Sequence, residues 1–405
     1  PNWPAHPLLS THQPRLRLLT RPMEFDLSWI LLGLPLAFVL GWVASRMDLR
    51  QLRLENRQTP KAYFKGLNHL LNEQQDQAID AFIEAVQHDP DTSELHFALG
   101  NLFRRRGEYE RAVRVHQHLL SRGDLSKTDH DRAQHALALD YLKAGLLDRA
   151  EAALTQLEGT AHEAQAHLAL LSIYERSRDW TKASVVAQKL SAAGQGSFQG
   201  RLAHYLCEEA ESLDAAQHTQ QVKDLLQQAI AAAPQAARAR IALAKVQEQT
   251  GVAQEAYNTL TGLASQVPAA LPLIAPHLAR LAHDLGGVPQ TLALLEASYA
   301  HTPSLDVLNA IVSLRTAQGE TNTSNWFAKH LEREPSLVAA TQWIAHEKFE
   351  HEQFHPQVQR ALERAAKPLQ RYRCAACGFE ATQHFWQCPG CQAWDSYPAR
   401  RVEEL

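Results

Sequence analysis

The amino-acid sequence predicts an all-α protein: a superhelical solenoid of repeated helix pairs, preceded by a single transmembrane helix and followed by a small metal-binding domain. Three observations predict it: a long uncharged apolar run near the N-terminus, a recurring pattern of small and large apolar residues in the middle, and two Cys-x-x-Cys pairs near the end. Hydrophobic residues make up 45 % of the chain and charged residues 21 %, which is typical of a folded protein. The formal net charge of -4 disfavours nucleic-acid binding.

Residues 1–22 precede the first methionine, Met23, and are rich in proline without a helical or strand period. We interpret this segment as a non-native or disordered extension, with the natural start at Met23. A basic targeting leader is the alternative, because the segment carries Arg15, Arg17 and Arg21.

An uncharged run, LSWILLGLPLAFVLGWVAS, extends from Leu27 to Ser45. As a helix it would be about 28 Å long, close to the hydrocarbon thickness of a bilayer. We therefore expect a transmembrane anchor at residues 23–46. A cleaved signal peptide is the alternative, but its apolar region is shorter and follows basic residues.

Basic residues follow the apolar run instead, in a juxtamembrane linker at residues 47–58 and just around it: Arg46, Arg50, Arg53, Arg57, Lys61 and Lys65. By the positive-inside rule, this charge predicts a single-pass membrane protein with the bulk of the chain facing the cytoplasm. The orientation is less strongly indicated if residues 1–22 are part of the protein, since both flanks are then basic.

The middle of the chain, residues 59–367, repeats an amphipathic helix pair. Gly66 and Gly100 are 34 residues apart, and so are Ala78 and Ala112. Small residues at these positions let two antiparallel helices cross closely. The period and the residues resemble those of the tetratricopeptide repeat (TPR) family.

Similar positions recur with some drift, and we count about eight or nine units. The recurring residues include Gly107, Tyr141, Gly145, Ala150, Tyr174, Ala183, Gly251 and Ala256. A stack of such pairs forms a superhelix whose first helices line a concave groove. The sequence therefore predicts a protein-binding surface that carries no catalysis; a helical spacer without a ligand is the alternative.

The stretch HEQFH, His351–His355, matches the H-E-x-x-H pattern of zinc peptidases, in which both histidines lie on one helix face. Pro356 disfavours helical geometry at His355, and no convincing third ligand is identifiable. We therefore expect an exposed helix end and a protein that is not an enzyme, with a zinc hydrolase as the alternative. Cys207 is expected to be a small core residue rather than a reactive thiol.

The other four cysteines, Cys374, Cys377, Cys388 and Cys391, form two Cys-x-x-Cys pairs separated by ten residues. Each pair can grip an ion from a tight turn, and two pairs supply a tetrahedron of sulfur ligands. Gly378 permits a positive φ after the first pair. The sequence predicts one zinc or iron ion, zinc preferred, with a structural role in a domain at residues 368–405. Disulfides fit a cytoplasmic face poorly, and the βαβ setting of a redox CxxC is missing.

This domain is too small to bury a core of its own. We expect it to dock onto the last repeats through Phe379, Phe385, Trp386 and Trp394, and we expect FEATQHFW, between the cysteine pairs, to form a short hairpin. A nucleic-acid-binding ribbon is the alternative, because four arginines flank the domain: Arg371, Arg373, Arg400 and Arg401.

The segment YRCAACGF…FWQCPGCQAW resembles a rubredoxin-type metal-binding domain, with Gln392 where rubredoxins usually have glycine. With the anchor, the basic flank and the repeats LGNLFRRRGEYERAVRVHQHLL and YLKAGLLDRAE, it is similar to the lipopolysaccharide assembly protein B (LapB, also called YciM) family over about residues 23–405.

The resemblance implies an inner-membrane adaptor with cytoplasmic repeats, which limits lipopolysaccharide synthesis by helping the membrane protease FtsH degrade the deacetylase LpxC. It implies that the anchor engages the protease, that the repeats and the metal domain engage the client, and that Cys374, Cys377, Cys388 and Cys391 hold the metal. Confinement to the membrane raises the client's effective concentration near the protease. A general scaffold that gathers envelope-biosynthesis enzymes is the alternative, and a homo-oligomer stays open.

Overall fold

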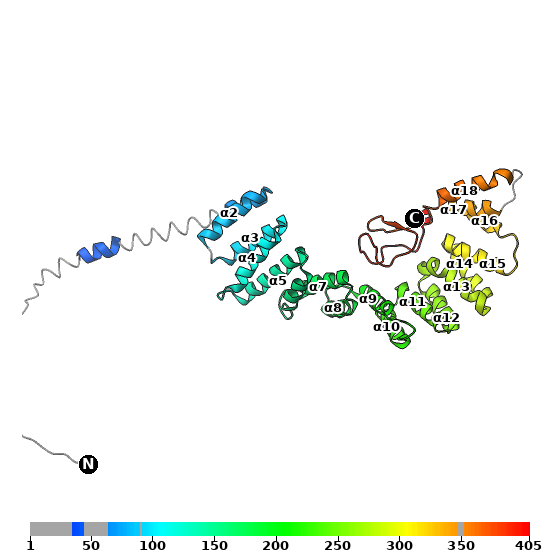
Figure 1. Cartoon of the computed structure of the whole chain (residues 1–405), viewed down its shortest axis with the longest axis horizontal. Helices are drawn as coiled ribbons and strands as arrows, with labels where there is room; N and C mark the ends of the chain where they lie inside the picture. The colour runs from blue at the N-terminus through cyan, green and yellow to red at the C-terminus, as the bar shows by residue number, and fades with distance from the viewer. Residues whose placement is uncertain (1–34, 44–63, 90, 347–351) are drawn as a thin grey trace, which may run out of the picture. The chain divides into compact units, whose positions relative to one another are not determined.

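The computed structural model describes residues 35–43, 64–89, 91–346 and 352–405, and these residues are mostly helical (Figure 1). The chain divides into two compact units, Pro1–Leu119 and Leu120–Leu405. The helices described in the first unit are residues 35–43, residues 64–71, α2 (Gln75–His88), α3 (Ser93–Arg106) and α4 (Tyr109–Ser121), the last of which crosses the boundary.

The second unit is a row of α-helices, two 3₁₀ turns within it, and a small C-terminal sheet. The helices are α5 (Lys127–Lys143), α6 (Leu147–Thr155), α7 (Glu163–Ser177), α8 (Trp180–Ala192), α9 (Gln199–Ser212), α10 (Thr219–Ala232), α11 (Ala237–Gln249), α12 (Ala253–Gln266), η1 (Pro268–Ala270), α13 (Leu271–Leu285), α14 (Val288–His301), α15 (Leu305–Ala317), α16 (Ser324–Arg333), α17 (Leu337–His346), η2 (Glu352–Phe354) and α18 (His355–Ala366). The strands are β1 (Tyr372–Arg373) and β2 (Glu380–Ala381), and η3 (Val402–Glu404) ends the chain.

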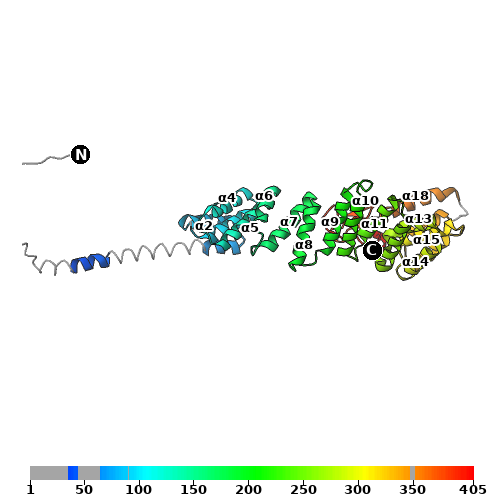
Figure 2. The same cartoon turned by 90° about the horizontal axis from the view of Figure 1, so that it is seen from below.

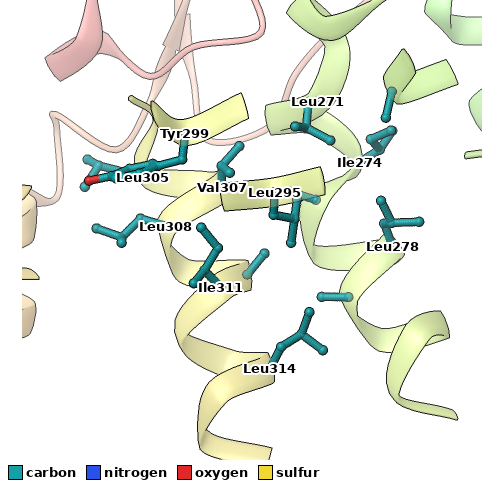
Figure 3. Packing of buried hydrophobic residues seen from close by; sticks show 14 of the residues in the cluster. Leu271, Ile274, Leu278, Leu295, Tyr299, Leu305, Val307, Leu308, Ile311 and Leu314 are labelled. Atoms are coloured by element: carbon teal, nitrogen blue, oxygen red, sulfur yellow. The ribbon is translucent and has the colours of Figure 1, made fainter. Parts of the chain in front are cut away.

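Helices of the second unit pair in chain order, α5 with α6, α7 with α8, α9 with α10 and α11 with α12, as a TPR-like solenoid requires (Figure 1 and Figure 2). Its largest core cluster spans α11 to α18. Figure 3 shows part of this packing, with labelled side chains from α13 (Leu271, Ile274, Leu278), α14 (Leu295, Tyr299) and α15 (Leu305, Val307, Leu308, Ile311, Leu314). Each helix pair thus buries its apolar face against its neighbours.

In the first unit, the repeated glycines make room for rings of the second helix. Ala78 and Ala112 are fully buried, as the pattern predicts. The atoms nearest to a side chain added at Gly66, however, belong to the ring of Phe82, and those at Gly100 belong to the ring of His116. The close approach is therefore made one helical turn beyond the alanines.

Replacing Gly100 by alanine is expected to destabilise the first unit by about 1–3 kcal/mol, because the new methyl carbon would lie 2.5 Å from the buried His116 ring. Gly262 in α12 is the matched control, since nothing lies within 4 Å of the added carbon there. Gly262→Ala should stabilise by about 0.5–1 kcal/mol through helix propensity. Denaturant unfolding of both variants measures this, and equal effects would contradict the packing argument.

The predicted anchor lies mostly outside the described residues, as do residues 1–22 and the linker at 47–58. Of residues 23–46, the structure describes 35–43, which are helical. Among the residues that the structure describes, no helix combines the length and the apolar character needed to cross a membrane.

The HEQFH stretch does not form one helix in its described part. Glu352 begins the turn η2, whereas His355 begins α18 and is followed by Pro356. The Nε2 atom of His355 lies 2.8 Å from the carbonyl oxygen of Ile344. His351 lies outside the described residues.

Cys207 lies fully buried in α9 within a core cluster, which confirms its prediction as a core residue. Burial raises the pKa of its thiol to about 12, so it remains protonated at neutral pH.

Candidate metal centre and its docking surface

The first cysteine pair is enclosed by the antiparallel strands β1 and β2, in which Tyr372 pairs with Ala381. The Cys374 N–H donates to the Phe379 carbonyl over 2.9 Å, and the Gly378 N–H donates to the Cys374 carbonyl over 2.9 Å. The prediction of a hairpin between the two cysteine pairs was therefore wrong. Instead, β1 and β2 lie on either side of the first pair, because the turn that contains this pair connects the two strands.

The second pair repeats this geometry. The Cys388 N–H donates to the Ala393 carbonyl over 2.9 Å, and the Gln392 N–H donates to the Cys388 carbonyl over 2.8 Å. Gly378 has φ 78° as predicted, and Gln392 in the equivalent position has φ 61°. The left-handed conformation costs a non-glycine residue about 1–2 kcal/mol. The second turn therefore keeps the conformation of the first, although Gln392 stands where rubredoxins usually have glycine.

The four sulfur atoms lie at the spacing that one metal ion requires. The Sγ atoms of Cys374 and Cys391 are 3.8 Å apart, those of Cys377 and Cys388 are 3.7 Å apart, and all four lie within 4.8 Å of one another. A tetrahedron with metal–sulfur bonds of about 2.3 Å has edges of about 3.8 Å. The four cysteines therefore fit one ion, and zinc and iron both accept this ligand set.

The protein environment favours some thiolates and opposes others. Burial raises the pKa of Cys374, but hydrogen bonds from the Ser396 hydroxyl and from the backbone N–H groups of Cys377 and Ala376 outweigh it and lower that pKa to about 6. At Cys377 a hydrogen bond from the Phe379 backbone is outweighed by burial and the neighbouring thiols, and the pKa rises to about 12. A divalent ion balances the charge that four thiolates would otherwise place together.

Around the cysteines, the metal domain has only a small core. Tyr372 and Tyr397 are buried with Cys374 and Cys388, and Leu273 of α13 packs against this cluster from the solenoid. The Nε2–H of His384 donates to the Tyr397 carbonyl oxygen over 3.0 Å, and burial lowers the pKa of the His384 imidazole. It is a packing residue beside the ion site.

Trp394 docks the metal domain onto α8, α9 and α11. Its ring stacks on His204 with centroids 4.7 Å apart and meets the edges of Trp180 and Tyr205 at 6.1 and 6.0 Å. Arg238 lies over the same ring at 5.9 Å. These contacts surround one indole with rings and a cation, an arrangement that stabilises aromatic side chains well beyond their buried area.

Neighbouring residues add polar contacts to this docking surface. The Asp395 carboxylate lies 2.8 Å from Nε2 of His204, which is 1 % exposed. The indole N–H of Trp394 donates to Glu175 of α7 over 3.3 Å. Trp386 packs against the large core cluster and lines a pocket with Arg238 of α11. The domain is thus held on α7, α8, α9 and α11, which belong to three successive helix pairs.

The C-terminal segment holds the N-termini of two further helices. The Glu404 carboxylate accepts from the Leu305 N–H at the start of α15, and Glu403 accepts from the Leu337 N–H at the start of α17. Arg401 forms a bidentate pair with Asp306 of α15, at 2.8 and 3.0 Å. Carboxylates at helix N-termini bind orphan N–H groups and match the helix dipole.

The prediction that the metal domain docks onto the last repeats was therefore too narrow, because the domain also contacts earlier helices. The domain and its C-terminal segment contact helices from α7 to α17, and Trp394, at one end of this surface, lies against α8, α9 and α11. Trp386 and Trp394 contact the solenoid as predicted, whereas Phe379 is 44 % exposed and Phe385 packs within the domain. In Figure 1 the C-terminal segment lies along the side of the row formed by α9 to α17.

The flanking arginines are largely engaged within the protein. Arg373 pairs with Glu380 at 2.8 Å, Arg371 lies 3.8 Å from the same carboxylate, and Arg401 pairs with Asp306. These pairs account for three of the four arginines that suggested a nucleic-acid-binding ribbon, and they reduce the charge that such a ribbon would present.

Replacing Glu404 by glutamine is expected to leave the protein as stable at pH 7, or slightly more stable. Burial raises the pKa of this carboxyl above its ordinary value of 4.5, outweighing the hydrogen bonds from Leu305 and Arg401. The folded state therefore binds a proton at Glu404 more readily than the unfolded state does. The free energy of unfolding falls as the pH rises from 4.5 through the raised pKa of Glu404. Glutamine keeps an accepting oxygen and removes this pH dependence.

Glu404→Ala, by contrast, should cost about 1 kcal/mol, because the Leu305 N–H at the start of α15 loses its acceptor. Thermal unfolding of both variants between pH 4 and pH 8 checks this. A glutamine variant as unstable as the alanine variant would show that the charge itself is needed.

The fold and the site define a class: a TPR solenoid that carries a rubredoxin-type metal-binding domain on its repeats. Residues 372–397 match the rubredoxin metal binding domain model, and residues 95–130 match a tetratricopeptide repeat model.

Relatives match almost the whole chain. Lipopolysaccharide assembly protein B of Escherichia coli strain K12 is 30 % identical over 94 % of this chain and 100 % of its own length. The protein of the same name from Haemophilus influenzae is 26 % identical over 91 % of this chain and 96 % of its own. The chain belongs to the lipopolysaccharide assembly protein B family.

Proposed function

We propose that this protein is a membrane-anchored cytoplasmic adaptor that regulates lipopolysaccharide synthesis by binding other proteins through its repeats. The observation that carries the proposal is the match to lipopolysaccharide assembly protein B over 94 % of the chain, across both the repeats and the metal domain. TPR arrays present an extended surface to protein partners. The apolar run at residues 27–45, at the length of a bilayer span, supports the inner-membrane anchor.

The metal domain has a structural role in this proposal, and Cys374, Cys377, Cys388 and Cys391 hold one ion, with zinc preferred. The inter-sulfur spacing of 3.7–3.8 Å supports this ligand set. Because the domain and its C-terminal segment contact helices from α7 to α17, we place client binding on the repeats before α7. Elemental analysis of the purified full-length chain identifies the ion.

The specific reaction that we propose to be regulated is the degradation of LpxC by the membrane protease FtsH, with the anchor engaging the protease and the repeats engaging the client. Tethering both proteins to one membrane raises their effective concentration without any chemistry in the adaptor. The alternative is a general scaffold that gathers envelope-biosynthesis enzymes.

The experiment compares the full chain with a chain lacking residues 1–46 in cells without their own copy of this protein. The full chain should shorten the half-life of LpxC, and the anchorless chain should lose this effect while still capturing LpxC in a pull-down. If the full chain also leaves the half-life of LpxC unchanged, the proposal is contradicted. Retained capture of several envelope enzymes would then favour the scaffold.

A hydrolase using HEQFH is tested separately by Glu352→Ala. The adaptor proposal expects full LpxC turnover with this variant, because Glu352 has no role in it. Loss of turnover by a variant that folds normally would support the hydrolase.

A further inference from the structure

A pocket of about 240 Å³ lies among α6, α7 and α8, outside the cysteine site. Its apolar lining includes Leu154, Leu170 and Val186. At one end, three side chains with metal-ligating atoms converge: Glu158 from the turn after α6, and Glu163 and His167 from α7. Glu163 and His167 are four residues apart, which places them on the same face of the helix.

The three ligand atoms lie within 4.8 Å of one another. His167 is only 8 % exposed, and in the described part of the chain it makes no hydrogen bond. A mostly buried imidazole that makes no hydrogen bond keeps a ring nitrogen free to bind a ligand, and here that ring lies beside two carboxylates. This buried histidine distinguishes the cluster from an ordinary surface group of acids.

One cation already touches the cluster. The Lys189 ammonium of α8 bonds to the Glu158 carboxylate and lowers the pKa of that carboxyl. The lysine side chain is 44 % exposed and reaches the site by a flexible stem, so it can withdraw into solvent. A second ion pair, between α8 and α6, joins Lys182 to Glu151, and its partners are 31 residues apart in the sequence, as Lys189 and Glu158 are.

We propose that Glu158, Glu163 and His167 form a second metal site, for a divalent transition ion such as zinc. Imidazole and carboxylate ligands suit zinc, and three protein ligands leave one coordination position open for water or for a partner's side chain. The ion replaces the Lys189 ammonium as the countercharge of Glu158. It ties the turn after α6 to α7 at a place that the cysteine site does not touch, and it does not depend on the proposed function.

The test measures zinc binding by equilibrium dialysis of the full-length protein whose cysteine site already holds one ion. The wild type should take up a second equivalent of zinc at pH 7.5, while His167→Gln and Glu163→Gln should each lose it and keep the first. His162→Gln is the matched control, because His162 is adjacent in sequence and outside the cluster. It should bind both ions.

A wild type that binds only one equivalent, or a second equivalent that survives in both cluster variants, overturns the proposal. If His167→Gln fails to fold by circular dichroism, Glu163→Gln decides the matter, because Glu163 is less buried. Binding should also weaken in acid, since the ligands must be deprotonated to hold the ion.

Lys189→Met separates a metal site from an ion pair that is only structural. If zinc competes with the ammonium, this variant should bind the second zinc about tenfold more tightly, equivalent to about 1.4 kcal/mol. Lys182→Met is the control and should leave the affinity unchanged, since its carboxylate partner Glu151 is outside the cluster. Unchanged or weaker zinc binding by Lys189→Met would contradict displacement of the ammonium.

Discussion

Removing the ion from the cysteine site should unfold the metal domain and release it from α7, α8, α9 and α11. The domain has two strands of two residues each and four buried core residues, two of which are cysteines. Structural zinc sites supply about 10–16 kcal/mol of apparent binding free energy in small domains, far more than this core provides. Cys388→Ser, which removes a fully buried ligand, should have the same effect as chelation.

The expected signals are a lower thermal unfolding temperature, a change in the fluorescence of Trp386 and Trp394, and faster hydrogen exchange at the starts of α15 and α17. The exchange should rise there because Glu403 and Glu404 no longer hold the helix N-termini. Cys207→Ala is the control: it creates a small core cavity but should leave the metal content unchanged. Chelation that leaves thermal unfolding unaltered would refute the structural role of the ion.

Truncating Trp394 should have the second largest effect, with a loss of about 3–5 kcal/mol of docking free energy. The indole meets His204, Trp180, Tyr205 and Arg238, so alanine removes every one of these contacts at once. The metal should remain bound, because the indole supplies no ligand. Thermal unfolding and metal content, measured on the same sample, check both parts of this expectation.

Phe379→Ala is the matched control within the same domain, since that ring is 44 % exposed and therefore loses less burial on truncation. It should cost well under half of the Trp394 effect. Equal losses for the two variants would mean that the domain does not depend on this contact with α8, α9 and α11.

Features set by neighbouring residues were predicted well. The helical repeat follows from the spacing of small and apolar residues, and Ala78 and Ala112 are buried as that spacing requires. The clustering of the four cysteines follows from two short turns, each closed by its own backbone hydrogen bonds. The left-handed residue after the first pair was predicted at Gly378, whereas the same conformation at Gln392 after the second pair was not.

The docking surface was predicted only in part, because aromatic residues in the metal domain show that a partner is needed but do not identify it. His204 and Asp395 are 191 residues apart, and Trp394 and Glu175 are 219 apart. The solenoid residues that contact the metal domain give only a weak indication of it in the sequence. They are polar or aromatic side chains at buried helix positions: His204, Tyr205 and Arg238.

By itself, the sequence determined a helical repeat protein with a four-cysteine ion site, since both depend on interactions within a few dozen residues. The tertiary structure alone decided where the metal domain lies and which carboxylates hold the starts of α15 and α17. These arrangements depend on how successive helix pairs stack. Small rotations between pairs accumulate along a solenoid, and no local pattern of residues records their sum.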